Sequence, residues 1–338
     1  MSEVDIFAAW MPPHVKLMHL VAAKWVTQPL YELARLGVAD LLDDGPRSVA
    51  DLAAACGVLE DPLRRCLRAA ASVGVFAEQP DGTFALTPMA GFLRSDVDLG
   101  LRDLTLLLNS PPMQDSFAEL GSVLETGEPG FPAANGTSFF EHLARDPALG
   151  AIYQRAWAPL TRGVAAETAR RLDLRDVKRV ADLGGGNGTF LLALREQHPH
   201  LSCVLMDRPE VLAEVTDSRL ELVPGVLPGQ IPADVDAYFI KNTLHCFDDR
   251  LVRDTLQAVR RAIGDRTDVR LHLIESVGLP GNTYDWGKLL DVELMTNNGG
   301  RVHSVEQWEK LLASCGFVLE EASDLVPPQW LLTCAPSR

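Results

Sequence analysis

A glycine-rich turn between a short apolar segment and a helical segment constrains the fold of this chain more than any other feature. Residues 180–188 read Val-Ala-Asp-Leu-Gly-Gly-Gly-Asn-Gly, and a helical pattern begins near Thr189. Glycines in such a turn let the backbone approach a ligand at the carboxyl edge of a parallel sheet. From residue 177 onward, short apolar runs alternate with helical stretches, which predicts an open α/β sheet. The predicted strands are Arg179–Leu183, Ser202–Met206, Leu220–Val223, Ala237–Ile240, Arg270–Glu275 and Trp330–Cys334.

The spacing of the glycines indicates which ligand the turn accommodates. A dinucleotide-binding turn reads Gly-x-Gly-x-x-Gly and holds a pyrophosphate, whereas this turn reads Gly-x-Gly-x-Gly after the acidic Asp182. S-adenosylmethionine has an ammonium group and no phosphate, so an acid beside the loop suits it. The second strand ends at Asp207, where a carboxylate can accept hydrogen bonds from both ribose hydroxyls. We therefore expect S-adenosylmethionine at this turn, with a nicotinamide dinucleotide as the alternative left open.

A histidine follows the fourth predicted strand. The segment after Ile240 places Lys241, Asn242 and His245 at the same sheet edge as the glycine turn. Imidazole has an ordinary pKa of about 6.5, so His245 can take a proton from a phenol-like hydroxyl as a methyl group arrives. Glu275, at the end of the next strand, is positioned to orient that imidazole. The alternative, that His245 only packs a helix terminus and Glu275 is satisfied by a loop, stays open.

The first hundred residues have the element order of a winged helix. Apolar residues recur at helical spacing over 14–42, and Ser48 suits the N-cap of a helix over 48–56 that Gly57 ends. A second helix from Asp61-Pro62 to about Ser72 and a hairpin turning at Pro80-Asp81-Gly82 follow. Residues 41–95 hold five arginines against seven acids, so no basic stripe for DNA results. We interpret this region as a packing or dimerisation module, followed by a mostly helical segment over 97–175.

The composition excludes several classes of protein. The chain has 338 residues and a net charge of −15, which argues against nucleic acid as a partner. It contains no uncharged apolar run long enough to span a bilayer, and its acidic N-terminus lacks the layout of a signal peptide, so we expect a cytoplasmic protein. Its six cysteines form no Cys-x-x-Cys pair and no zinc-finger spacing, so we expect no metal site.

Together these motifs resemble the small-molecule O-methyltransferases of the plant caffeic-acid and bacterial antibiotic-tailoring type. The segments that carry the likeness run nearly the whole length of the chain, and they are 182–188, His198-Pro, 207–211, 241–249, 294–301 and 308–317. The resemblance implies a homodimer that uses S-adenosylmethionine in secondary metabolism such as antibiotic biosynthesis, with His245 as general base and Glu275 beside it. The cofactor contacts it implies are Asp182, Gly184, Gly186, Asp207, Val226, Leu227 and Lys241. The substrate contacts it implies are Phe117, Phe140, Trp157, Met295 and Asn298.

Three positions depart from the pattern of that family. The family usually has an acid for the adenine after the third strand, where this chain has Val226-Leu227. Members of the family often have the sequence His-Asp-Trp where this chain has His245-Cys246-Phe247. Plant members also have a second glutamate where this chain has Val302. The imidazole therefore has fewer acids to orient it, which leaves room for a mechanism based on proximity and desolvation.

We therefore predict an α/β protein: a Rossmann-like class I methyltransferase domain with an N-terminal, mostly α-helical winged-helix dimerisation domain. The predicted parts are a dimerisation domain over 1–100, a helical region lining the substrate pocket over 101–175 and a catalytic domain over 176–338. The predicted function is O-methylation of a small aromatic natural-product intermediate. Methylation of carbon or nitrogen, a purely electrostatic role for the cofactor, and a cofactor-sensing winged-helix regulator are the alternatives.

Overall fold

The structure is a computed structural model that describes residues 11–282 and 284–337. The chain forms two compact units, one of Met1–Gln114 with Ala148–Pro159 and the other of Asp115–Pro147 with Leu160–Arg338. The helix α12 (Pro147–Arg171) contributes residues to both. The three-part division predicted from the sequence stays a prediction. Within the described ranges, no helix is both long and apolar enough to cross a membrane.

The first unit has the predicted order of helices and hairpin. The helical stretch over 14–42 is divided into α1 (Pro13–Val21), α2 (Lys24–Arg35) and α3 (Val38–Leu41). Gly37 separates the last two, because its φ of 67° is a left-handed conformation that glycine adopts without strain. The remaining elements are α4 (Val49–Cys56), α5 (Glu60–Ser72), β1 (Phe76–Glu78), β2 (Phe84–Leu86), α6 (Pro88–Gly91), α7 (Arg102–Leu108) and the start of α8 (Pro111–Ala118).

Local signals fix the ends of these elements as the sequence predicts. The Ser48 hydroxyl accepts a hydrogen bond from the backbone N–H of Asp51 at 3.1 Å, and Gly57 ends α4 in a left-handed conformation. β1 and β2 pair antiparallel around a turn in which Asp81 Oδ1 accepts from the backbone of Thr83. Leu33, Leu52, Leu67 and Phe76 pack in the core of this unit.

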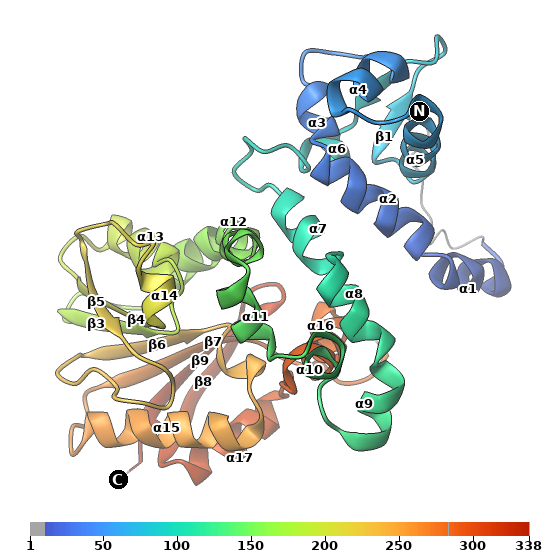
Figure 1. Cartoon of the computed structure of the whole chain (residues 1–338). Coiled ribbons are helices and arrows are strands. Elements are labelled where there is room, and N and C mark those ends of the chain that lie inside the picture. The colour runs from blue at the N-terminus through green and yellow to red at the C-terminus, as the bar shows by residue number, and fades with distance from the viewer. Residues whose placement is uncertain (1–10, 283, 338) are drawn as a thin grey trace. The chain divides into compact units, whose positions relative to one another are not determined.

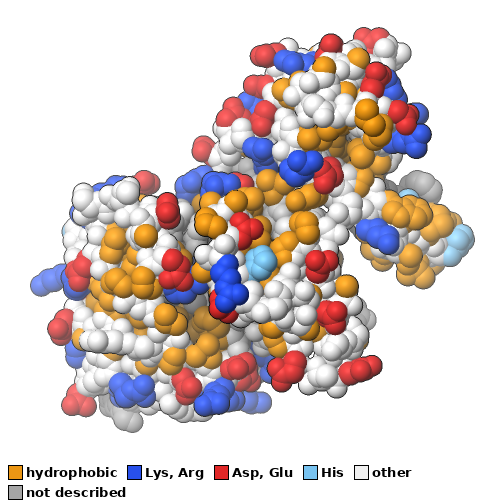
Figure 2. Space-filling view, in the orientation of Figure 1, with side chains coloured by type: hydrophobic (Ala, Val, Ile, Leu, Met, Phe, Trp, Pro, Cys, Tyr) orange, Lys and Arg blue, Asp and Glu red, His pale blue; other side chains and the backbone are white. Residues whose placement is uncertain are grey.

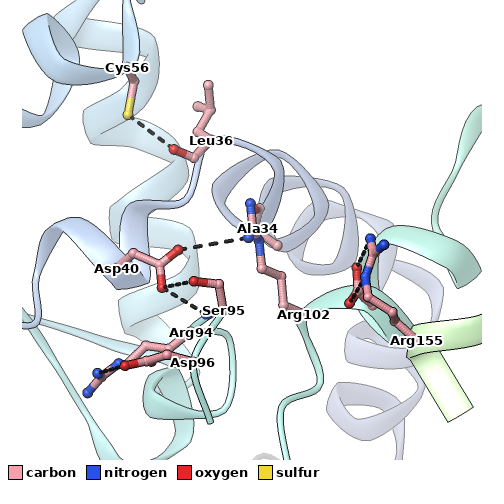
Figure 3. A network of polar contacts seen from close by, with 10 residues as sticks. Ala34, Leu36, Asp40, Cys56, Arg94, Ser95, Asp96, Arg102 and Arg155 are labelled. Atoms are coloured by element: carbon pink, nitrogen blue, oxygen red, sulfur yellow. Dashed lines mark hydrogen bonds and ion pairs between the residues drawn. The ribbon is translucent and has the colours of Figure 1, made fainter. Parts of the chain in front are cut away.

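Polar contacts tie distant segments of the first unit together (Figure 3). Asp40 accepts hydrogen bonds from both the backbone N–H and the hydroxyl of Ser95. The Arg102 guanidinium on α7 donates to the carbonyl of Ala34 on α2 at 3.0 Å. Arg155, which is part of this unit, forms a two-pronged ion pair with Asp103 at 2.9 and 3.0 Å.

The second unit is built on a seven-stranded sheet (Figure 1). Its strand order is β5-β4-β3-β6-β7-β9-β8, in which β5, β4, β3, β6 and β7 are parallel to one another. β9 runs antiparallel to both β7 and β8. The strands are β3 (Arg179–Leu183), β4 (Ser202–Asp207), β5 (Leu220–Pro224), β6 (Ala237–Lys241), β7 (Arg270–Ser276), β8 (Phe317–Val326) and β9 (Gln329–Pro336).

Helices cover both faces of this sheet, which is why its central strands are continuous apolar runs. α13 (Thr189–Gln197) and part of α12 pack on one face, and α15 (Asp249–Ile263) and α17 (Val305–Ser314) pack on the other (Figure 1). Alternate residues of β3 reach the two sides, with Val180 in one core and Ala181 in the other. The further helices are α9 (Leu120–Thr126), α10 (Gly130–Asn135), α11 (Phe139–Arg145), α14 (Pro209–Leu212), the 3-10 helix η1 (Leu244–Cys246) and α16 (Trp286–Asn298).

Candidate active site

The glycine turn joins β3 to α13 at the carboxyl edge of the parallel strands. Gly184, Gly186 and Gly188 all have positive φ, of 75°, 61° and 78°. Since side chains rarely tolerate that conformation, the alternating glycines follow directly from the path of the backbone. Gly185 is required for another reason: a Cβ there would lie 2.5 Å from Asp182 Oδ2 and from a methyl carbon of Leu205.

Asp182 lies directly beneath this turn. Its side chain is fully buried, and neither carboxylate oxygen has a hydrogen-bond partner among the described residues. Burial raises the pKa of Asp182 to about 7, which the positive charge of Lys241 partly opposes and the charge of Asp207 reinforces. A buried carboxylate without donors is costly unless a ligand supplies them. An ammonium group above the turn would meet this need, so the residues present fit S-adenosylmethionine.

Asp207 occupies the end of the neighbouring strand β4. Its two oxygens accept hydrogen bonds from the backbone N–H groups of Gly186 and Arg208, each at 2.7 Å. Burial raises the pKa of Asp207, and these two hydrogen bonds oppose the rise. Each oxygen retains a second lone pair, which a ribose hydroxyl can use. The carboxylate is thus held in place by the same turn that encloses Asp182.

The predicted adenine side of the site is apolar. Gly225 donates to the carbonyl of Asp207 at 2.9 Å, which brings the end of β5 next to β4. Val226 is exposed, while Leu227 is partly buried against the core of the sheet. Neither side chain offers a hydrogen bond to adenine.

His245 and Glu275 form a buried ion pair at the same sheet edge. His245 Nδ1 lies 2.6 Å from Glu275 Oε2, and both side chains are nearly inaccessible to solvent. Glu275 Oε1 also accepts hydrogen bonds from the backbone N–H groups of Thr243 and Leu244, at 3.1 and 2.9 Å. One carboxylate therefore anchors the loop before η1 and faces the imidazole.

The electrostatics of this pair favour the protonated imidazole. Burial alone would lower the pKa of His245, but the charge of Glu275, with a smaller contribution from Cys246, outweighs it and raises the pKa to about 10. Lys241 has the opposite balance, because burial lowers the pKa of its ammonium group more than Asp182 and Glu275 raise it.

Thr243 links the loop that leads to His245 to the glycine turn, a contact that the sequence did not reveal. Its hydroxyl donates to the carbonyls of Lys241 and Gly184, at 3.0 and 3.3 Å. A Cβ on Gly184 would lie 2.7 Å from the Thr243 methyl carbon. The second residue after β6 and the first residue after β3 therefore pack closely against one another.

Two of the three positions that depart from the family pattern, Cys246-Phe247 and Val302, pack in a small apolar cluster. Cys246, Leu294 and Val302 are buried together, and Phe140, Phe247 and Leu290 pack against them. The uncharged side chain of Val302 is part of this cluster, and its backbone N–H donates to Asp291 Oδ1 at 2.6 Å. Among the described residues around His245, Glu275 is the acid paired with the imidazole.

The predicted substrate residues are distributed over several elements. Phe140 lies on α11, with its ring 6.4 Å from that of Phe247, and the Arg208 guanidinium lies over it at 5.5 Å. Asn298 ends α16 with a buried, unpartnered Oδ1, and Met295 is half-buried on the same helix. Phe117 is exposed at the end of α8. Trp157 belongs to the other unit, so its place in the pocket stays a prediction.

Comparison with known proteins shows the family of this chain. An O-methyltransferase domain matches residues 117–318, and an O-methyltransferase dimerisation domain matches residues 18–96. The chain is 33% identical to the phenazine O-methyltransferase PhzM of Lysobacter antibioticus, over 90% of this chain and 91% of that protein. It is also 33% identical to the 8-amino-8-demethylriboflavin N,N-dimethyltransferase of Streptomyces davaonensis, over 85% of each chain.

Solved structures show the same fold. The crystal structure of LaPhzM superposes with a TM-score of 0.90 at 31% identity, covering 96% of this chain and 100% of that one. NcsB1, an O-methyltransferase from neocarzinostatin biosynthesis solved with S-adenosylmethionine and 2-hydroxy-5-methyl naphthoic acid, gives a TM-score of 0.80 at 27% identity, covering 97% and 100%. The glycine turn, the matched domains and these relatives show that the chain belongs to the O-methyltransferase family of S-adenosylmethionine-dependent enzymes.

Proposed function

We propose that this protein methylates a hydroxyl group of a small aromatic intermediate of secondary metabolism, with S-adenosylmethionine as the methyl donor. The observation that carries the proposal is the buried pair of His245 and Glu275 at the same sheet edge as the unpartnered carboxylate of Asp182. Asp182, Gly184, Gly186, Asp207 and Lys241 would hold the donor, with Val226 and Leu227 against the adenine. Bound S-adenosylmethionine supplies an electrophilic methyl group on a sulfonium centre.

The contribution of His245 in this proposal is to accept the proton of the hydroxyl. Since Nδ1 faces Glu275, Nε2 is the nitrogen left for the substrate. Phenolic hydroxyls have pKa values of about 10, so an imidazole whose pKa is raised to about 10 takes such a proton at little cost in free energy. Phe140, Met295 and Asn298 would bound the substrate on the side of α11 and α16, with Phe117 and Trp157 as further predicted contacts.

N-methylation is the second candidate, because a relative at 33% identity is an N,N-dimethyltransferase. An amine is already nucleophilic and depends less on a base. Both candidates are tested by incubating the protein with S-adenosylmethionine and a panel of phenols, indoles and amines, then following product mass. We expect a phenol to gain one methyl group. Measurable binding of S-adenosylmethionine without methylation of any compound would contradict the proposal.

The pairing of His245 with Glu275 predicts an unusual pH dependence. In the wild type, kcat/KM for a phenolic substrate should rise with pH well above 7, because the imidazole must lose its proton to act as a base. The variant E275Q keeps an oxygen for the amides of Thr243 and Leu244 but removes the negative charge. The rise of kcat/KM should therefore move toward pH 6.5, and the plateau value of kcat/KM should fall.

The variant H245A removes the imidazole, and its kcat should be about 10²–10⁴ lower than that of the wild type. A loss below about tenfold, or an unchanged profile in E275Q, would contradict a role as base.

The glycine turn predicts a specific loss of donor binding. G185A places a methyl group 2.5 Å from the carboxylate of Asp182, so we expect the Kd for S-adenosylmethionine to rise about tenfold or more. G121A is the matched control, since a Cβ at that position meets nothing within 4 Å. Isothermal titration calorimetry measures both variants without any substrate. Equal Kd values for the two would refute the placement of the donor.

We also propose a homodimer formed through the N-terminal helices. Apolar side chains that the fold leaves exposed gather over α1 and the start of α2 (Figure 2), namely Leu17, Met18, Leu20, Val21 and Trp25. Exposed apolar patches of this kind mark interfaces. Sedimentation velocity should show a dimer for the wild type and a monomer for V21E/W25E, while L59E, at another exposed leucine of the same unit, stays dimeric. A monomeric wild type would exclude this surface as a dimer interface.

A further inference from the structure

A buried pair of polar side chains on α16 has no part in the mechanism proposed above. Asn297 Nδ2 donates to Glu293 Oε1 at 2.9 Å and to the Glu293 carbonyl at 3.1 Å. Asn297 is only 3% exposed, and its Oδ1 receives no hydrogen bond from any described residue. Buried carbonyl oxygens nearly always accept a hydrogen bond in native proteins, so the Asn297 Oδ1 atom calls for a donor from outside the chain.

The position of the pair on the helix places it next to the face of α16 that packs against η1. Leu290 and Leu294 pack with Cys246, so this face of α16 is directed toward η1. Residues three and four apart are neighbours on a helix, and Glu293 and Asn297 therefore form the adjoining stripe. The turn after α16 also contacts the base directly, because Arg301 donates its backbone N–H to the carbonyl of His245 at 3.0 Å.

The charge of Glu293 has no cationic partner within the described part of the chain. Burial raises its pKa to about 7, and the hydrogen bond from Asn297 opposes the rise. Of the elements packed against α16, η1 carries His245 and Cys246, α9 and its N-cap carry Glu125 and Glu119, and α10 carries no ionisable side chain. α8, which donates a hydrogen bond to the carbonyl of Thr296, carries Asp115, and α11 carries His142 and an Arg145 that is paired with Glu141. Burying a carboxylate without a cationic partner costs free energy, and an apolar side chain would fill the same space without that cost.

We propose that Glu293 and Asn297 form a subsite that accepts a hydrogen bond from an N–H group on the methylated substrate. Asn298 Oδ1 is also buried without a donor among the described residues, but it follows Leu294 by one turn and so lies outside the stripe of Glu293 and Asn297. The substrate would then be an aromatic compound that bears an amino group or ring N–H in addition to the hydroxyl that is methylated. This inference rests on the proposed function and narrows its substrate class.

The test measures binding and does not depend on turnover. The enzyme is saturated with S-adenosylhomocysteine and titrated calorimetrically with the ortho, meta and para aminophenols and with the three matching cresols, in which a methyl group replaces the amino group. The wild type should bind at least one aminophenol about tenfold more tightly than its cresol, since a hydrogen bond to a buried acceptor is worth about that much. E293L should reduce this preference to about twofold or less.

The control is E309L, which removes an exposed glutamate on α17 and should keep the full preference. If E293L fails to fold by circular dichroism, E293Q decides the question, because it keeps the shape of Glu293 and should lower the preference about threefold or more. Binding of cresols as tightly as aminophenols, no binding of any probe at about 10 mM, or a full preference in E293L would overturn the subsite. If one of these results overturned the subsite, methyl transfer to a phenol without N–H groups would still support the proposed function.

Discussion

The carboxylate of Glu275 connects the sheet to the loop that leads to His245, and the geometry of the site depends on it. Its Oε1 binds two consecutive backbone amides after β6, and its Oε2 faces the imidazole of His245. A buried carboxylate is expensive to desolvate, and removing one partner of such a pair costs about 3–5 kcal/mol. Since Cys246 and Val302 carry no carboxylate, Glu275 fixes both the path of the loop and the charge of the His245 imidazole.

The glycine turn is joined to this arrangement through Thr243, whose hydroxyl reaches the carbonyl of Gly184. Two strands that are neighbours in the sheet, β3 and β6, thus bring the glycine turn into contact with the loop that leads to His245. Asp182 and Glu275 are both fully buried, but they differ in their partners. Glu275 has two backbone amides on Oε1 and the imidazole of His245 beside Oε2, whereas neither oxygen of Asp182 has a hydrogen-bond donor among the described residues, as expected for a group that a ligand completes.

The sequence predicts the parts of this fold whose signals are local. The alternating glycines and the Ser48 cap follow from neighbouring residues, and the structure confirms them. The six predicted strands are also present, with ends that differ by at most two residues from those predicted. The prediction was incomplete at β8, because this edge strand, Phe317–Val326, has Glu320 and Glu321 within it and lacks the apolar run of a buried strand. Contacts over long range could not be predicted either, since nothing near Thr243 or Glu293 in the sequence indicates what they touch.

The central claim is that Glu275 holds His245 as a base with a raised pKa. The most direct measurement is a pH titration of the imidazole nitrogens by ¹⁵N NMR, with the His245 signals assigned by their absence in H245Q. The account predicts that both nitrogens of His245 are protonated at neutral pH and that the ring titrates several pH units above its ordinary value of about 6.5. A neutral imidazole at pH 7, titrating near 6.5, would contradict it.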